Sequence, residues 1–195
     1  MHDAMTIRTR RAALAAILLL FIAATILWAM GRPPICTCGT VSLWGKVGPA
    51  QSQMLADWYS PSHFIHGLVF YWLAWLVAPT LPNKISQPVE WRFLVALLVE
   101  AAWEIAENSP IVIDRYREAT MALGYSGDSI LNSISDIGMM AIGFVAARKL
   151  PLWASIALAI GFELLTLAII RDNLTLNVWM LVAPNDAIRT WQAGA

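Results

Sequence analysis

Charged residues are scarce in this chain of 195 residues: they make up 13% of it, whereas hydrophobic residues make up 58%. A soluble domain carries about 25% charged residues, so the composition predicts an integral membrane protein. The formal net charge is zero, and without an excess of basic residues nucleic acid is excluded as a partner. The sequence also has no internal repeat. We therefore expect a single transmembrane domain over residues 1–195.

Cysteine is almost absent, and the two that exist, Cys36 and Cys38, form a C-x-C pair. A disulfide between residues so close in sequence closes almost no loop and would stabilise the fold little. Two ligands are too few for a metal site of their own. We expect incidental or oxidation-sensitive thiols.

Long apolar runs are abundant and predict an all-α bundle of about five transmembrane helices. Ser60 and Pro61 are a helix start signal, as N-cap and first helical residue. The segments between the runs are rich in Pro and Gly or polar, and residues 111–127 are predicted to lie outside the lipid with a short surface helix. The C-terminal run from residue 174 is too short to span and is predicted to lie at the interface. The five expected helices cover residues 12–30, 61–78, 91–108, 128–147 and 152–170.

The basic residues predict the orientation of this bundle. With five spans the termini lie on opposite sides, and the short connections on the N-terminal side are basic. By the positive-inside rule that side is cytoplasmic, which predicts a bacterial inner-membrane protein with a periplasmic C-terminus. The residues concerned are Arg8, Arg10, Arg11, Lys84 in the link 83–90, Arg92, Arg148 and Lys149.

Polar residues are unusually concentrated in the outer half of this bundle. Glu100, Glu104 and Glu107 share one helix face, because they are four and three residues apart. A carboxylate at the bilayer centre costs roughly 2.5–3.5 kcal/mol, so these groups must be protonated, paired, hydrated or bound to a cation. At the same depth, neighbouring helices carry His63, His66, Asp128, Asn132, Asp136 and Glu163.

Two kinds of chemistry fit this set. His and carboxylate side chains on facing helices suit a divalent metal such as Zn, Mn or Fe, for which His63, His66 and Glu104 are the candidate ligands. The same groups could instead perform acid/base catalysis without a metal. The candidate catalytic residues are His66, Glu100, Glu104, Asn132 and Asp136, and Arg115 and Arg117 in the next loop could hold an anionic group of a substrate.

Structural interpretations stay open for the same residues. Glu107 and Asp128 lie near predicted helix ends, where they could be interfacial, or a helix cap in the case of Asp128. Interhelical hydrogen bonding alone could explain the other polar residues, and Glu163 could serve packing. Most Trp and Tyr residues, Tyr59 among them, fit belts at the membrane interface.

Several strings of this chain resemble an uncharacterised family of small multi-pass bacterial inner-membrane proteins, known as a domain of unknown function. They are ICTCG, DWYSPSHFIHG, EAAWEIAENSPIVIDRYREAT, GYSGDSILNSISDIGMMAIGF and RDNLTLNVWML. This resemblance covers nearly the whole chain and implies a membrane protein, without an activity.

A more distant similarity is to VanZ-like membrane proteins. Their order of residues is matched by Asp57, His63, Glu100 or Glu104, and Asp128 followed by Asn132. Asp136 departs from that pattern, which has a small residue there. The similarity implies a role in the cell envelope, and it adds Asp57 to the candidate substrate-binding residues.

Three functional hypotheses follow. The first is an outer-face enzyme acting on a membrane lipid or lipid-linked envelope precursor. The second is a carrier of protons or divalent cations, which the apolar inner halves of the helices disfavour. The third is a non-catalytic envelope scaffold.

Overall fold

The computed structural model describes residues 2–48, 50–77, 80, 88–120 and 124–194. In these residues every regular element is a helix and none is a strand, which confirms the predicted all-α class. Predicted and observed bounds agree for the helix at 152–170 and differ by a few residues elsewhere, except at the N-terminus, where the helix begins earlier. The elements are α1 (His2–Ala29), the 3-10 turn η1 (Gln51–Gln53), α2 (Ser60–Val77), α4 (Val89–Glu107), α5 (Pro110–Ala119), α6 (Ile130–Lys149), α7 (Leu152–Ile170), α8 (Leu174–Val182) and α9 (Asp186–Gln192).

Three helical segments are long and apolar enough to cross a membrane: Ile7–Ala29, Ile130–Lys149 and Leu152–Ile170. The outward faces of α1 and α7 are exposed and apolar, as in Phe21 and Trp153, whose exposed fractions are 69% and 73%. Apolar side chains exposed in this way suit contact with lipid. Of the five spans predicted, α2 and α4 are not among these three segments, because both contain several polar residues.

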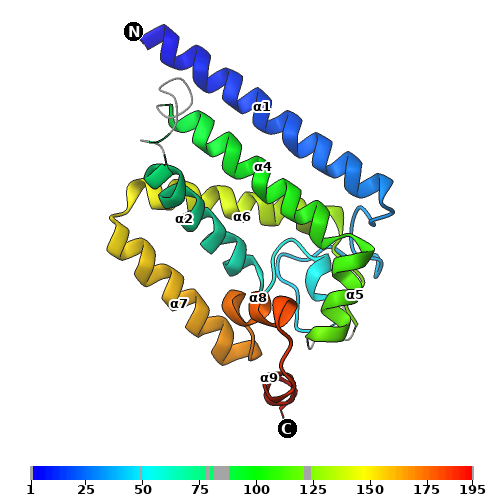
Figure 1. Ribbon diagram of the computed structural model, residues 1–195. Coiled ribbons are helices and arrows are strands. Elements are labelled where there is room, and N and C mark those ends of the chain that lie inside the picture. The colour runs from blue at the N-terminus through cyan, green and yellow to red at the C-terminus, as the bar shows by residue number, and fades with distance from the viewer. Residues whose placement is uncertain (1, 49, 78–79, 81–87, 121–123, 195) are drawn as a thin grey trace.

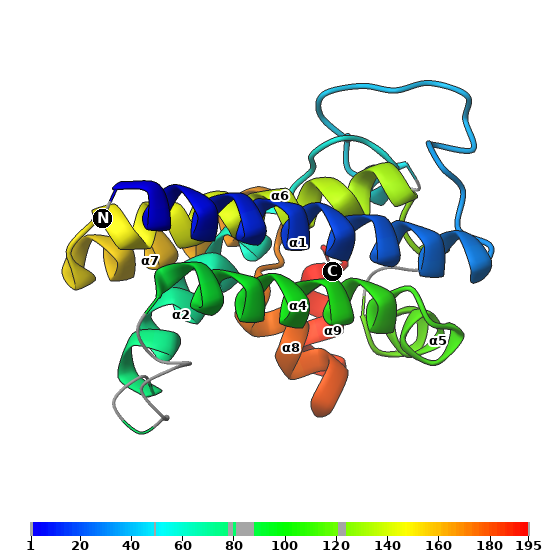
Figure 2. The same cartoon turned by 90° about the horizontal axis from the view of Figure 1, so that it is seen from above.

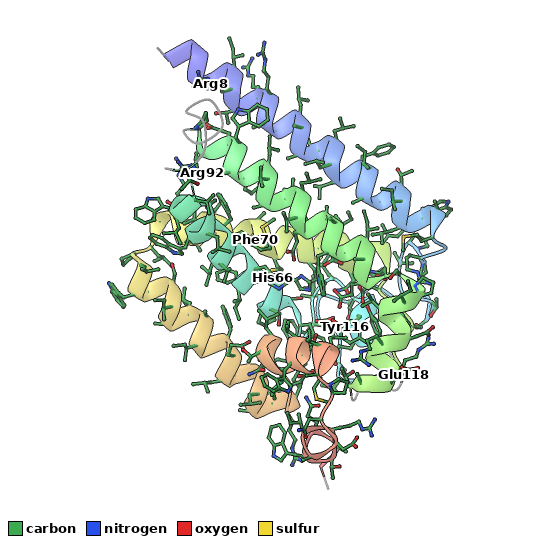
Figure 3. The ribbon with its side chains drawn as sticks, in the orientation of Figure 1. Arg8, His66, Phe70, Arg92, Tyr116 and Glu118 are labelled. Atoms are coloured by element: carbon green, nitrogen blue, oxygen red, sulfur yellow. A yellow bond between two sulfur atoms is a disulfide. The ribbon has the colours of Figure 1, made fainter. Side chains whose placement is uncertain are left out.

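The long helices alternate in direction (Figure 1). Helices α1 and α4 run side by side in the same direction, and Figure 2 shows the same pair from above. Helix α2 runs the opposite way, and α6 and α7 form a hairpin beside it. One end of the bundle carries α5, α8, α9 and the loop after α1. Arg8 and Arg92 lie at the other end (Figure 3).

Helices α2 and α6 cross in direct backbone contact, and two glycines make this possible. A methyl group at Gly67 would overlap the carbonyl of Met140, and one at Gly143 would overlap the carbonyl of Phe64. Small residues let helix backbones approach closely in membrane proteins. His63 lies one turn before Gly67 and Asp136 two turns before Gly143, so the contact brings these side chains to the same place.

The apolar core lies next to this crossing. Helices α1, α4 and α6 contribute to it, and small side chains such as Ala23 and Ala96 bring α1 against α4. The buried cluster consists of Ala23, Ala96, Leu97, Ala101, Ile137, Met140 and Phe144. It lies beside the middle of α4, which has no charged residue between Arg92 and Glu100.

The short helices differ in how well the sequence predicted them. Helix α5 confirms the short helix expected in residues 111–127, and its N-cap Ser109 accepts a hydrogen bond from the Val112 N–H. The short C-terminal run predicted from residue 174 forms α8, whereas α9 was not predicted. Cys36 and Cys38 form a disulfide, the oxidised form of the oxidation-sensitive pair considered above. The turn between them brings their Cα atoms within 5.1 Å, which lies in the range that a disulfide requires.

Two helix starts also correct the sequence prediction. Asp57 accepts hydrogen bonds from the N–H groups of Tyr59 and Ser60 at the start of α2, and the Ser60 hydroxyl donates elsewhere. Ser129 rather than Asp128 is the N-cap of α6, since its hydroxyl accepts from the Asn132 N–H. Most of the predicted polar link 83–90, including Lys84, lies outside the described residues.

Candidate functional site

A cavity of about 250 Å³ opens at the end of the bundle that carries the short helices. Its walls come from α2, α4, α5, α6 and α8 and from the loop before α2. Five carboxylates line it, together with both histidines of α2. None of the described residues that line it is Lys or Arg. The carboxylates are Asp57, Glu100, Glu107, Asp128 and Asp136. The cavity therefore carries an excess of negative charge even with both histidines protonated.

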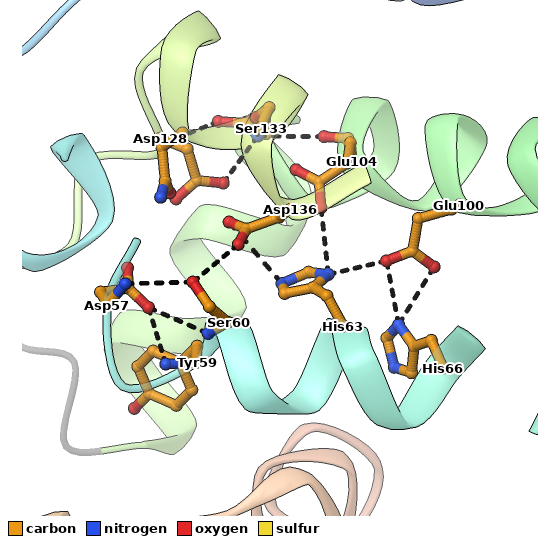
Figure 4. A network of polar contacts seen from close by, with 12 residues as sticks. Asp57, Tyr59, Ser60, His63, His66, Glu100, Glu104, Asp128, Ser133 and Asp136 are labelled. Atoms are coloured by element: carbon orange, nitrogen blue, oxygen red, sulfur yellow. Dashed lines mark hydrogen bonds and ion pairs between the residues drawn. The ribbon is translucent and has the colours of Figure 1, made fainter. Parts of the chain in front are cut away.

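His63 lies at the centre of the polar network (Figure 4). Its Nδ1 is 2.7 Å from Glu100 Oε1 and 3.3 Å from Glu104 Oε1, and its Nε2 is 3.9 Å from Asp136 Oδ2. The short contact with Glu100 places a proton on Nδ1 as the donor. In the neutral ring this leaves Nε2, on the Asp136 side, with a free lone pair.

Glu100 connects the two histidines. The Nδ1 atom of His66 lies 3.1 Å from both carboxylate oxygens of Glu100, which is fully buried. Histidines that bind metals commonly donate the proton of their other ring nitrogen to a carboxylate. Glu100 is in the position to orient both rings in this way.

Glu104 is buried without a hydrogen bond. Its side chain is 1% exposed, and neither carboxylate oxygen has a hydrogen-bond partner. The His63 Nδ1 that faces it already donates to Glu100. Buried polar groups are nearly always hydrogen-bonded, so a buried carboxylate that has only a 3.3 Å ion-pair contact with His63 can accept a further ligand.

Asp57 and Asp136 connect the loop before α2 to α6. The Ser60 hydroxyl donates to Asp136 Oδ1 at 3.0 Å and accepts from the Asp57 N–H at 3.0 Å (Figure 4). Burial raises the pKa of Asp57 to about 7, with a smaller contribution from the charge of Asp128, although the Tyr59 N–H bond opposes the shift. Asp57 can therefore change its charge near neutral pH.

Asp128 lies at the start of α6, on the far side of Glu104 from Glu100. Its two oxygens accept hydrogen bonds from the Asn108 amide at 2.8 Å and the Tyr125 hydroxyl at 3.0 Å. Glu107, one turn after Glu104 on α4, lines the same part of the cavity. The interfacial or capping roles considered for Glu107 and Asp128 therefore do not describe their surroundings.

Helix α8 forms one wall of the cavity. Leu174, Asn177 and Val178 line the cavity, and Asn177 accepts a hydrogen bond from the Tyr116 hydroxyl of α5 at 3.0 Å. The Tyr59 hydroxyl donates to Asp172, just before α8, at 2.9 Å. Burial raises the pKa of Asp172 and, more strongly, that of Tyr59, so the hydroxyl keeps its proton at neutral pH.

Three groups of these residues could each bind a cation. In each, one ligand atom per residue lies within 4.8 Å of the others. The sets are His63, His66 and Glu100; His63, Glu104 and Asp136; and Glu104, Glu107 and Asp128. The second set unites two predicted metal ligands, His63 and Glu104, with Asp136 from α6.

The structure separates some predicted site residues from the cavity. Arg115 donates to the carbonyl of Leu181 at 2.9 Å, and Arg117 donates to the carbonyl of Tyr125, so neither lines the cavity. Glu163 caps α8, where its two oxygens accept from the N–H groups of Leu174 and Thr175. The other predicted residues, His63, His66, Glu100, Glu104, Asn132, Asp136 and Asp57, lie in or next to the cavity.

Sequence reasoning missed the hydroxyl and amide groups that support these acids. These groups donate hydrogen bonds to residues that line the cavity or, in the case of Tyr59, to Asp172 just before α8. They belong to Ser60, Tyr59, Tyr116, Tyr125 and Asn108. Tyr59 was interpreted as part of an interfacial belt. The only signal in the sequence was their position within two to four residues of an acid or histidine.

These features define a class: an all-helical protein with helices of membrane length and a buried cavity of histidines and carboxylates at one end. Residues 27–194 match the family model described as "Protein of unknown function (DUF2585)", and the chain belongs to this family. It is 54% identical to a UPF0314 protein of Paracoccus denitrificans over 95% of both chains. A UPF0314 protein of Agrobacterium fabrum is 57% identical over 89% of this chain and 86% of its own.

A UPF0314 protein of Sphingopyxis alaskensis is 56% identical over 93% of this chain and 94% of its own. No solved structure matches the chain. The predicted resemblance to an uncharacterised bacterial family is therefore confirmed, and the similarity to VanZ-like proteins stays a prediction.

Proposed function

We propose that this protein is a multi-pass enzyme of the bacterial inner membrane that binds a divalent cation and acts on a lipid or lipid-linked envelope substrate. The observation that carries the proposal is the buried carboxylate of Glu104, which lacks a hydrogen bond and faces His63 and Asp136. Imidazole and carboxylate are the ligands that Zn, Mn and Fe share in proteins.

A cation held by His63 Nε2, Glu104 and Asp136 resolves the electrostatics of this part of the cavity. Neither carboxylate oxygen of Glu104 has a hydrogen-bond partner, so lone pairs of this group are free for a ligand. A cation satisfies the carboxylate directly, while Glu100 holds the Nδ1 proton of His63. When bound, such a cation supplies Lewis-acid chemistry.

A five-span topology supports access from the periplasmic leaflet. Arg8, Arg92, Arg148 and Lys149 lie at the end of the bundle away from the cavity, as the positive-inside rule expects of a cytoplasmic end. The Cys36–Cys38 disulfide lies in the loop after α1, at the same end as the cavity. Disulfides persist in the bacterial periplasm, which supports the same orientation.

The lining of the cavity favours an amphiphilic substrate. Phe70, Val99, Trp103, Leu174 and Val178 provide apolar walls beside the charged floor. The exposed apolar residues of α8, including Trp179 at 56% exposed, suit a helix that lies at the membrane interface. A lipid headgroup could therefore reach the acids while its chains stay in the bilayer. The envelope role implied by the VanZ-like similarity agrees with this substrate class.

The apolar core disfavours the carrier hypothesis. Beside the middle of α4, Leu97, Ile137 and Met140 pack together in the apolar cluster, and each of these side chains is at most 3% exposed. A carrier needs a polar path to both sides of the membrane, and this cluster offers none in the residues described.

The test compares the lipids of a bacterium lacking the gene with those of the same strain carrying wild-type or His63→Gln protein. We expect the deletion to change one class of envelope lipid, the wild type to reverse the change, and His63→Gln to fail although it inserts normally. An unchanged lipid profile, or full restoration by His63→Gln, would overturn the proposal. Glu118→Gln, an exposed change on α5, serves as the matched control.

A further inference from the structure

We infer that the cavity binds two divalent cations and that the carboxylate of Glu104 bridges them. The inference rests on the proposed function, which requires only the first cation. The second cation would lie among Glu104, Glu107 and Asp128, on the side of the cavity away from His63.

The two sets of possible ligands meet at Glu104 alone. His63 and Asp136 belong to one set, and Glu107 and Asp128 belong to the other. In each set the ligand atoms lie within 4.8 Å of one another, a spacing that a single cation can span. Because both Glu104 oxygens are buried without a partner, one oxygen is available to each cation. Carboxylate bridges of this kind hold the paired metals of helical di-iron and di-manganese proteins.

Charge balance gives an independent argument for two cations. The two sets contain four different carboxylates, those of Glu104, Glu107, Asp128 and Asp136, which together carry a charge of −4 when they are ionised as cation ligands. One divalent cation would leave −2 in a cavity whose described lining residues include no Lys or Arg. Two divalent cations balance the four carboxylates, while Glu100 is paired with His63 and His66.

The surroundings of Asp128 suit a metal ligand. Asn108 and Tyr125 each donate one hydrogen bond to its carboxylate, one to each oxygen. A carboxylate has about four lone-pair positions, so two bonds leave room for a cation. Hydrogen bonds of this type orient the first ligands of a metal site. Glu107, which is half-buried, also lines the cavity.

The experiment measures Mn²⁺ bound to full-length protein purified in detergent, stripped with a chelator and then dialysed against MnCl₂. We expect two equivalents per chain and an exchange-coupled electron paramagnetic resonance signal from the bridged pair. Glu107→Gln should bind one equivalent and give an uncoupled six-line signal, and Asp128→Asn should do the same if it folds. Glu118→Gln should bind two.

The outcomes separate the two proposals. One equivalent in the wild type that Glu107→Gln retains and His63→Gln loses would overturn the pair and leave the first cation site standing. No bound Mn²⁺ in the wild type would overturn both proposals. Two equivalents that survive in Glu107→Gln without a change in coupling would overturn the assignment of the second site.

Discussion

Glu104→Gln is the substitution whose effect on stability should change sign with the cation. In the absence of a cation, the wild-type carboxylate is buried near Glu107, Asp128 and Asp136 and has no hydrogen bond. Glutamine keeps the shape and removes the charge, and its amide group can donate to a neighbouring acid. Because His63 keeps its 2.7 Å bond to Glu100, no partner is stranded. Replacing a buried carboxylate that lies among other acids in this way should stabilise the fold by about 1–3 kcal/mol.

With a cation present the order should reverse. A ligand at one hundred times its dissociation constant stabilises the folded state by about 2.7 kcal/mol. For a chain of this size that corresponds to a rise in Tm of about 5–10 °C. The wild type should show this rise on addition of Mn²⁺, and Glu104→Gln should lose most of it because the variant lacks the shared ligand.

Thermal unfolding in detergent, followed with EDTA and with excess Mn²⁺, measures both effects in one series. Glu118→Gln controls for the loss of one negative charge and should respond to Mn²⁺ as the wild type does. If Glu104→Gln lowers the Tm by the same amount in EDTA and in Mn²⁺, Glu104 has a purely structural role and the reasoning fails.

Three further predictions follow from the structure. Gly67→Ala should separate α2 from α6 and lower the free energy of unfolding in denaturant by about 2–3 kcal/mol. Gly138→Ala, whose added methyl group meets no atom within 4 Å, should be neutral or slightly stabilising. Equal effects of the two substitutions would contradict the close crossing of α2 and α6. The pKa of Asp57 is raised to about 7 from 3.8, so its contribution to stability should be complete below pH 4 and should decline as pH rises through 7. Asp57→Asn should reduce the corresponding decline in Tm. A pH profile of Tm that is the same in Asp57→Asn and the wild type would refute this prediction. Glu163→Ala removes the acceptor of two N–H groups and should destabilise the start of α8 by about 1–2 kcal/mol, measured as faster amide hydrogen exchange at residues 174–176. Glu163→Gln should destabilise it less. Unchanged exchange in Glu163→Ala would show that the cap is dispensable.

Much of the candidate site could be predicted from sequence because helical periodicity is local. Residues three and four apart share a helix face, so Glu100, Glu104 and Glu107 had to lie together. The scarcity of charge elsewhere made the acids conspicuous. The same local rule predicted α7 to the residue, because its apolar run is bounded by Pro151 and Arg171.

The partners of each side chain were decided by tertiary structure. The sequence places the basic Arg115 in the loop next to the predicted acids, but only the packing of α5 against α8 directs its side chain to the Leu181 carbonyl. Likewise, the sequence places Glu163 at the depth of the other acids, and the fold uses it to cap α8. Both cases depend on how elements distant in sequence are joined, which periodicity does not describe.

The sequence by itself therefore determined that helices of membrane length would bury a few carboxylates and histidines near one end. Only the tertiary structure decided which of these acids has a partner. The glycine contact between α2 and α6 sets how close His63 and Asp136 come, and the position of α4 gives Glu100 hydrogen bonds to both histidines and leaves the Glu104 carboxylate without a hydrogen bond. That difference between two glutamates one turn apart depends on the register in which three helices cross, and no spacing within a single helix encodes it.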